Sequence, residues 1–130
     1  MNNGNITGKY KFEYYTICGD TNHWSRPKEA LPSLPAIEDG SIVVLDGATA
    51  IWRHAMAFLS AYEELGEKEC AIAINDPALG AVVILSKING LSQGDVLTLL
   101  GKNAEKQTDE EVEKTIAKIE DNRKKRLSRN

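Results

Sequence analysis

The chain has 130 residues, 42% of them hydrophobic and 27% charged, a composition typical of one soluble globular domain with a real core. Its apolar runs fall well short of the ~20 residues that cross a bilayer, so no membrane-spanning helix is predicted. The net charge is −3, but the last eight residues carry five basic side chains and residues 1–122 have a net charge of −8, which disfavours non-specific binding to nucleic acid.

The two cysteines, Cys18 and Cys70, stand far apart with no CxxC pattern. The N-terminal residues lack a basic start followed by an apolar stretch, as a secretory signal would have. We therefore expect reduced thiols, a cytoplasmic location and no structural zinc.

In chain order, the first half predicts a strand, a loop, a second strand and a helix. Residues 10–17 are rich in β-formers, and a proline-rich loop follows with a short helical turn expected at residues 28–31. Residues 41–45 form a continuous apolar run, typical of a strand covered on both faces. The next segment predicts a helix ended by Gly66. Its expected buried stripe consists of Ile51, Ala55, Phe58, Tyr62 and Leu65.

The second half predicts three further strands and a helix. Residues 70–74 should run parallel to the preceding strand, because one helix connects the two. Residues 80–85 follow after a short turn and should be antiparallel, and residues 96–100 add another strand. Thr108 and Glu111 form a capping-box pattern at the start of a charged helix.

The predicted fold is α/β: a mixed sheet with a βαβ core, a β-hairpin and a C-terminal helix. Residues 1–100 would form the α/β domain, and residues 101–130 a charged helix able to contact a partner protein.

Two segments should meet beyond the carboxyl ends of the parallel strands, where ligands of such sheets bind. One is the turn at residues 46–50, which enters a helix N-terminus, a favourable position for phosphate. The other is Asn75-Asp76, which adds a carboxylate. A phosphate cradle beside a carboxylate predicts a phosphodiester site, although an Asp-Pro pair also fits an ordinary turn.

Three segments carry a resemblance to a known family. They are GSIVVLDGATAIWRHAMAFL, AIAINDPALGAVVILSK and GLSQGDVLTL, all between residues 40 and 99. In order and spacing they resemble the CRISPR-associated ring nucleases of the third class, small ancillary proteins of type III CRISPR systems. The most specific piece is the run from Asp76 to Val83, which is similar to the DPxLGAVVV hairpin of that family.

The resemblance implies a compact Rossmann-like sheet and a cyclic-nucleotide-binding domain over residues 1–100. It implies binding, and in many members cleavage, of cyclic tetra-adenylate, the second messenger of the type III effector. It also implies a homodimer that becomes a tetramer or filament when two dimers enclose one ligand, with opposite ends of the protomer meeting around it. Family activity is manganese-dependent, which makes Mn²⁺ the expected cofactor, and related proteins act on RNA.

Residue by residue, Asp76 matches the functional aspartate of the family and is the implied catalytic group and metal ligand. Gly47 matches the glycine of the phosphate loop. The full candidate set is, for catalysis, Asp76, Lys87 and His54, and, for ligand binding, Gly47, Ala48, Thr49, Trp52, Arg53 and Asn75.

The sequence departs from the family at three positions. Ala78 stands where Arg is common, Lys87 stands where His is common, and Gly66 to Glu69 contains no counterpart of an upstream His. These changes remove a phosphate clamp and acid–base groups, although Lys87 can still bind phosphate as a point charge.

Several candidates also fit simpler roles. Trp52 could stack on an adenine or pack in the core or at a dimer interface. His54 could be catalytic or a buried hydrogen-bonded residue, and Arg53 could contact phosphate. His23 and Trp24 could form a lid or a surface loop. The final basic cluster could touch RNA or be a solvated helix end.

The leading hypothesis is therefore a cyclic oligoadenylate ring nuclease. Two alternatives stay open: a sensor or sponge that binds the messenger without cutting it, and a messenger-activated RNase assembled by oligomerisation.

Overall fold

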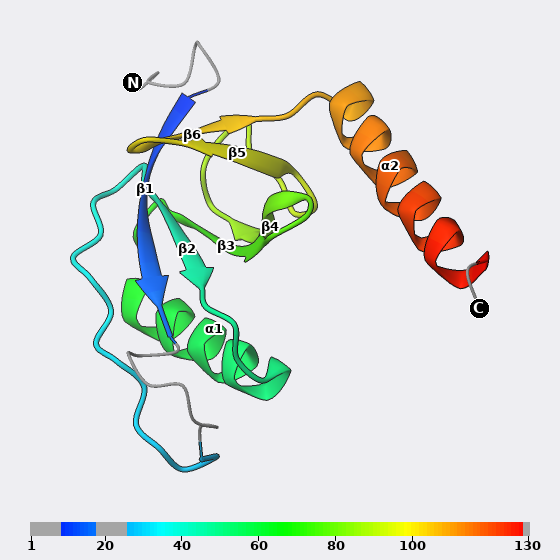
Figure 1. Cartoon of the computed structure of the whole chain (residues 1–130). Coiled ribbons are helices and arrows are strands. Elements are labelled where there is room, and N and C mark those ends of the chain that lie inside the picture. The colour runs from blue at the N-terminus through cyan, green and yellow to red at the C-terminus, as the bar shows by residue number, and fades with distance from the viewer. Residues whose placement is uncertain (1–8, 18–25, 129–130) are drawn as a thin grey trace.

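The computed structural model describes residues 9–17 and 26–128, which form a small barrel with two helices (Figure 1). The elements in chain order are β1 (Lys9–Thr16), β2 (Ile42–Asp46), α1 (Ile51–Leu65), β3 (Ala71–Asp76), β4 (Gly80–Ser86), β5 (Val96–Leu100), β6 (Asn103–Lys106) and α2 (Asp109–Ser128).

The six strands form one mixed sheet that closes on itself in the order β1-β2-β3-β4-β5-β6. β1, β2 and β3 run parallel, and every other neighbouring pair, including β6 with β1, is antiparallel. The β2–β3 pair is parallel because α1 connects the strands as a crossover, and the β3–β4 pair is antiparallel because only a short turn separates them. The α/β class, the βαβ core and the hairpin are confirmed.

Closure of the sheet was not predicted from the sequence. β6 has a single buried residue, Ala104, yet it pairs with β5 on one side and with the start of β1 on the other. Because β6 fills the gap between β5 and β1, the described strands leave no free edge. The Rossmann-like description, which implies an open sheet, is not confirmed.

The barrel interior is filled by alternate side chains of its strands. Two large rings of β1, Tyr10 and Phe12, lie in this space with alanines from three other strands. The small alanine side chains leave room for the two rings inside a narrow barrel. The interior core consists of Tyr10, Phe12, Ile42, Val44, Ala71, Ala73, Ala81, Val83, Ile88, Leu91, Leu97 and Ala104.

Helix α1 packs against the outside of β2 and β3, and the residues it buries are Arg53, Ala57, Ala61 and Leu65. The buried stripe predicted from the sequence is wrong at most of its positions. Ile51 is 85% exposed, Tyr62 is 46% exposed and Ala55 is also exposed. The helix is apolar on two faces, and the face with Ala57 and Ala61 packs on the strands because small side chains allow the closer approach.

The proline-rich segment between β1 and β2 has no regular secondary structure where it is described. The helical turn predicted at residues 28–31 is wrong: the Glu29 N–H donates to the Arg26 carbonyl at 3.0 Å, which closes a simple turn. The Tyr15 hydroxyl donates to the Pro32 carbonyl at 2.6 Å and so ties this segment to β1. Burial raises the pKa of Tyr15 above its ordinary value, so it stays a donor at neutral pH.

Helix α2 leaves the barrel as a separate rod, and none of its described residues is buried (Figure 1). The predicted capping box is confirmed. The Glu111 N–H donates to Thr108 Oγ1 at 3.1 Å, and the Thr108 N–H donates to Glu111 Oε1 at 2.8 Å. Within the described ranges, no helix is both long and apolar enough to cross a membrane.

Candidate functional site

The carboxyl ends of β2 and β3 lie side by side at one rim of the barrel. The register pairs Leu45 with Ile74, and the Asn75 side-chain amide donates to Asp46 Oδ1 at 3.0 Å. Gly47 directly follows Asp46 in the chain, and Asp76 directly follows Asn75. The turn that enters α1 and the turn that carries Asp76 therefore start from the same edge of the sheet.

The turn into α1 leaves the helix N-terminus without a side-chain cap. Ala50 is the N-cap residue and makes no such bond, and the first turn of α1 contains no acidic residue. The positive end of the helix dipole is therefore not neutralised locally, which favours a nearby anion. Gly47 adopts a φ of +134°, a conformation open mainly to glycine. Ala48 is exposed and Thr49 is half-buried.

The Asp76 carboxylate is exposed and shapes the β3–β4 turn. Its Oδ1 accepts hydrogen bonds from the Ala78 N–H at 2.9 Å and from the Leu79 N–H at 3.0 Å. Gly80 closes the turn with a φ of +122°, and a Cβ there would lie 2.7 Å from the Leu97 carbonyl oxygen. The turn is therefore pinned against β5, and the structural role of Asp76 is established. Its ligand role stays a prediction.

A shallow hollow of about 340 Å³ lies beside this turn. Gln107 helps to shape it, because its side-chain amide donates to the Leu79 carbonyl at 3.2 Å and to Thr98 Oγ1 at 3.0 Å. The hollow is lined by Tyr14, Asn75, Asp76, Pro77, Ala78, Leu79, Gly80, Thr98, Leu99 and Gln107.

Sequence reasoning missed three polar residues at this rim, Tyr14, Thr98 and Gln107, and it placed Asp46 there within the turn at residues 46–50 without naming it as a candidate. Asp46 could have been found, because it ends an apolar strand with a carboxylate just as Asp76 does. Gln107 carried no signal, since it reaches the rim only through the unpredicted strand β6.

Lys87 lies at the opposite end of β4 from Asp76. Its backbone N–H donates to the Cys70 carbonyl at 2.9 Å, at the start of β3. Its ammonium donates to the Gly66 carbonyl at 2.6 Å, beyond the C-terminus of α1, and lies 5.9 Å from the centre of the Tyr62 ring. One chain therefore does not bring Lys87 and Asp76 together.

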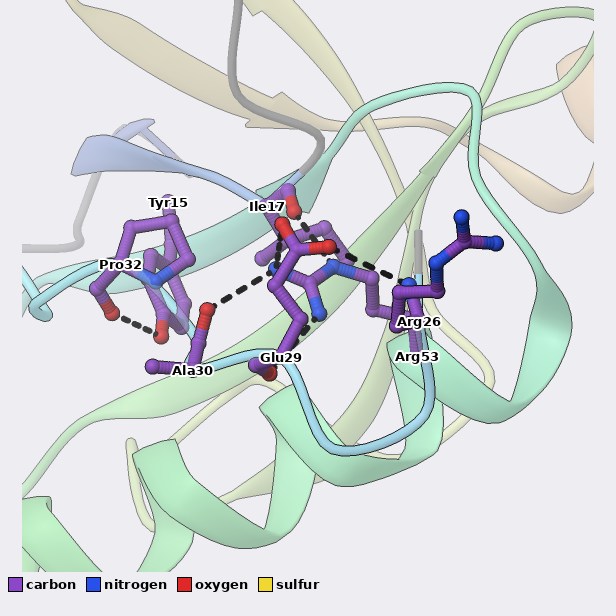
Figure 2. Close-up of polar contacts among 7 residues, drawn as sticks. All are labelled: Tyr15, Ile17, Arg26, Glu29, Ala30, Pro32 and Arg53. Carbon is purple, nitrogen blue, oxygen red and sulfur yellow. Dashed lines mark hydrogen bonds and ion pairs between the residues drawn. The ribbon is translucent and has the colours of Figure 1, made fainter. Parts of the chain in front are cut away.

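Arg53 is only 3% exposed and is used inside the protein (Figure 2). Its Nε donates to the Ile17 carbonyl at 2.9 Å, and its two terminal nitrogens donate to the carbonyls of Glu29 and Ala30 at 3.4 and 3.3 Å. A long ion pair of 4.0 Å to the Glu29 carboxylate adds to these bonds. The guanidinium, predicted as a phosphate contact, thus holds the proline-rich segment against the end of β1.

The remaining candidates lie on the first turn of α1 or outside the described residues. Trp52 and His54 are both half-buried, and His54 Nδ1 lies 3.4 Å from the Ala50 carbonyl oxygen. Their predicted roles in stacking and catalysis stay predictions. His23 and Trp24 lie outside the residues that the structure describes.

For a metal ion, residues 9–17 and 26–128 contain no group of three or more His, Cys, Asp or Glu side chains placed to hold one. Asp46 already accepts a bond from Asn75, and Asp76 Oδ1 accepts two backbone N–H groups. The described residues of one copy therefore do not by themselves fit Mn²⁺, which binds through several oxygen or nitrogen ligands.

These features define a class: a small mixed barrel with one crossover helix and a polar rim at the carboxyl ends of its parallel strands. A family model described as CRISPR-associated protein (Cas_csx3) matches residues 25–98, more than half of the chain. The chain belongs to this CRISPR-associated family, and the matched segment carries both turns of the rim. A search of curated proteins found no match.

Proposed function

We propose that this CRISPR-associated protein binds a cyclic oligoadenylate, cyclic tetra-adenylate in the first instance, and cleaves it as a ring nuclease of type III immunity. The observation that carries the proposal is the Asn75–Asp46 hydrogen bond. It joins two strand ends, so that an uncapped helix N-terminus and a turn carboxylate start from one rim. Phosphate prefers the first of these groups, and a ribose hydroxyl can bond to the second.

In this proposal the backbone amides at Gly47, Ala48 and Thr49 hold one phosphate of the ring, and the half-buried Trp52 stacks on an adenine. Asn75 contacts the ligand beside them. The second oxygen of Asp76 accepts a hydrogen bond from the attacking 2′-hydroxyl and orients it toward the phosphorus. It takes the hydroxyl proton as the new oxygen–phosphorus bond forms and the bond from phosphorus to the leaving 5′ oxygen breaks. His54, from the same turn of α1 as Trp52, is the candidate proton donor to the leaving oxygen.

Lys87 would act on a ligand held by another copy of the chain. It belongs to the far end of β4, so its ammonium could neutralise charge developing at a phosphate only where two protomers meet end to end. This requirement agrees with the dimer and tetramer implied by the family resemblance. Mn²⁺, if used, would need further ligands besides Asp76 from a neighbouring copy, and no step here depends on it.

A second candidate function is binding without cleavage, as a messenger sponge or sensor. It is favoured by the two bonds that Asp76 Oδ1 already makes within its own turn and by the bond of Lys87 to Gly66. Ala78, where the family commonly has Arg, also leaves the turn without a phosphate clamp.

The test is incubation of the full chain with radiolabelled cyclic tetra-adenylate, with and without Mn²⁺, beside Asp76→Asn. Asparagine can still accept the bonds from Ala78 and Leu79 but has no charge, so the turn should survive. The matched control is Asp39→Asn. Asp39 is also exposed and its Oδ1 accepts one backbone bond, from the Glu69 N–H at 3.0 Å, but it precedes β2 at the opposite end of the barrel.

We expect linear products from the native chain and Asp39→Asn, and at least a ~100-fold lower rate from Asp76→Asn, the scale of losing one oriented catalytic group. Tight binding without products would support the sponge or sensor instead. Cleavage of added RNA only in the presence of the messenger would support the messenger-activated RNase. No binding of any cyclic oligoadenylate would refute the proposal.

A further inference from the structure

Helix α1 exposes an apolar face directly opposite the one that packs on the barrel. Leu59 is 59% exposed and Met56 41% exposed, and the face runs from one end of the helix to the other. At 100° per residue these side chains point away from Ala57 and Ala61, the centre of the buried face. The exposed face consists of Ile51, Ala55, Met56, Leu59 and Tyr62. We call it the outer face of α1.

Helix α2 carries a second unpartnered apolar stripe. Val112 and Ile116 are half-buried, Ile119 is 39% exposed, and none of the described residues of α2 is buried. Arg123 continues the same stripe one turn later. We call Val112, Ile116, Ile119 and Arg123 the α2 stripe.

The two surfaces match in length and in charge. Ile51 and Tyr62 stand eleven residues apart, as do Val112 and Arg123, which is ~16 Å on either helix. α1 ends in acidic side chains with no basic residue in its last turn, whereas α2 begins with acidic residues and ends with basic ones. In a parallel arrangement, the basic end of α2 lies beside the acidic end of α1.

One charged pair follows from this register. Arg123 on the stripe would meet Glu63, which borders the outer face near its end. Among the described residues neither of these side chains forms an ion pair. In an antiparallel arrangement Arg123 would instead lie at the α1 N-terminus, the positive end of that helix dipole.

The two helices do not meet within one chain. Two residues connect β6 to α2, and Gln107 anchors this connection to the β3–β4 turn and β5. From there α2 points away from the barrel, and α1 lies under β2 and β3 (Figure 1). We propose that α2 of one copy packs in parallel along the outer face of α1 of a second copy. Exchanged reciprocally, this contact gives a closed two-fold dimer with two equal interfaces.

The inference does not rest on messenger binding and is tested without a ligand, by sedimentation equilibrium of the full chain over a concentration series. We expect a dimer whose dissociation constant rises at least ~10-fold in Leu59→Glu and in Ile116→Glu, because each places a charge in the centre of an apolar contact. The matched control is Leu100→Glu, which is 54% exposed on β5 and lies outside both surfaces; it should leave the constant unchanged. Far-UV circular dichroism checks that each variant is folded.

Charge reversal tests which helices pair. Glu63→Arg alone and Arg123→Glu alone should each weaken the dimer, and the double variant should recover most of the native constant, because the pair is restored with its signs exchanged. Any of three results would overturn the proposal. The native chain stays monomeric, the dissociation constant is unchanged in Leu59→Glu and Ile116→Glu, or the double variant dimerises as weakly as the two single effects added together predict.

Discussion

Arg53 is buried, although its position in the sequence predicts an exposed side chain. On a helix of ordinary amphipathic appearance, a basic side chain near the start is expected at the surface. Here it is 3% exposed and donates to three backbone carbonyls, at Ile17, Glu29 and Ala30. These carbonyls belong to chain without regular pairing partners. A planar guanidinium with several donors can satisfy all three at once, which an ammonium cannot.

Arg53→Ala should lower the free energy of unfolding by about 2–4 kcal/mol, because it leaves the buried Ile17 carbonyl without its donor, removes two part-buried bonds and opens a cavity. Urea denaturation measures this loss. Arg53→Lys should recover only part of it, since one ammonium cannot reach all three acceptors.

The ion pair to Glu29 should contribute little by comparison. The Glu29 side chain is 48% exposed and the pair is 4.0 Å long, so Glu29→Gln should change stability by less than ~0.5 kcal/mol. If Glu29→Gln and Arg53→Ala lower the free energy of unfolding equally, Arg53 would stabilise the fold mainly through the ion pair and not through its bonds to the carbonyls.

At the scale of single elements, the two helices follow different rules. α2 begins where its capping box places it, because Thr108 and Glu111 satisfy each other's backbone N–H groups locally. α1 has no such cap and its position comes from packing, with Ala57, Ala61 and Leu65 against the strands while Ile51, Met56 and Leu59 stay exposed. Local hydrogen bonding is visible in sequence, but the choice between two apolar faces is not.

The capping box makes a pH prediction. The bond from the Thr108 N–H holds the pKa of Glu111 below its ordinary value. A lowered pKa in the folded state means that the cap stabilises α2 above the unfolded pKa, ~4.3, and that this stabilisation is lost as pH falls through the folded pKa. The Thr108 amide proton shift, followed by NMR, should titrate with a midpoint below that of a model glutamate.

In Glu111→Gln this transition should disappear while the bond remains, because glutamine keeps the geometry of the box but does not ionise in this range. Glu110→Gln, the adjacent exposed glutamate, should leave the Thr108 titration in place. An unchanged titration in Glu111→Gln would assign the effect to another carboxylate.

At the scale of the whole molecule, the closed barrel makes one interior shared by all six strands. β1 contributes its two large rings and also pairs with both β2 and β6, so it joins the beginning of the chain to its last strand. Loss of packing inside should therefore weaken the whole barrel rather than one hairpin.

Phe12→Ala should lower the free energy of unfolding by about 3–5 kcal/mol, since Phe12 is 7% exposed and its removal leaves a cavity in the interior. Urea unfolding followed by circular dichroism and by tryptophan fluorescence should give one coincident transition. Tyr14→Ala is the control, because Tyr14 is the next residue on the same face of β1 but is 46% exposed. This substitution should lower the free energy of unfolding much less. Transitions that separate in Phe12→Ala would contradict a single cooperative barrel.

Local signals were enough to predict much of this fold. The apolar runs of β2, β3 and β4, the crossover through α1, the short turn after Asp76 and the Thr108 cap all depend on residues close in sequence, and all are confirmed. The order of the motifs was also enough to indicate a CRISPR-associated family, which the family match confirms. For the site, the sequence correctly predicted that the turn into α1 and the turn of Asp76 start from one edge.

Contacts between distant residues decided the rest. β6 is polar and becomes a strand only because β5 and the start of β1 offer it backbone partners. The buried face of α1, the internal use of Arg53 and the arrival of Gln107 at the rim likewise depend on which surfaces fit together once the sheet has closed. By itself the sequence determined the strands, helices and turns whose hydrogen bonds and periodicity are local. Only the tertiary structure decided which of two apolar faces and which polar side chains became interior, because burial is a property of the assembled chain.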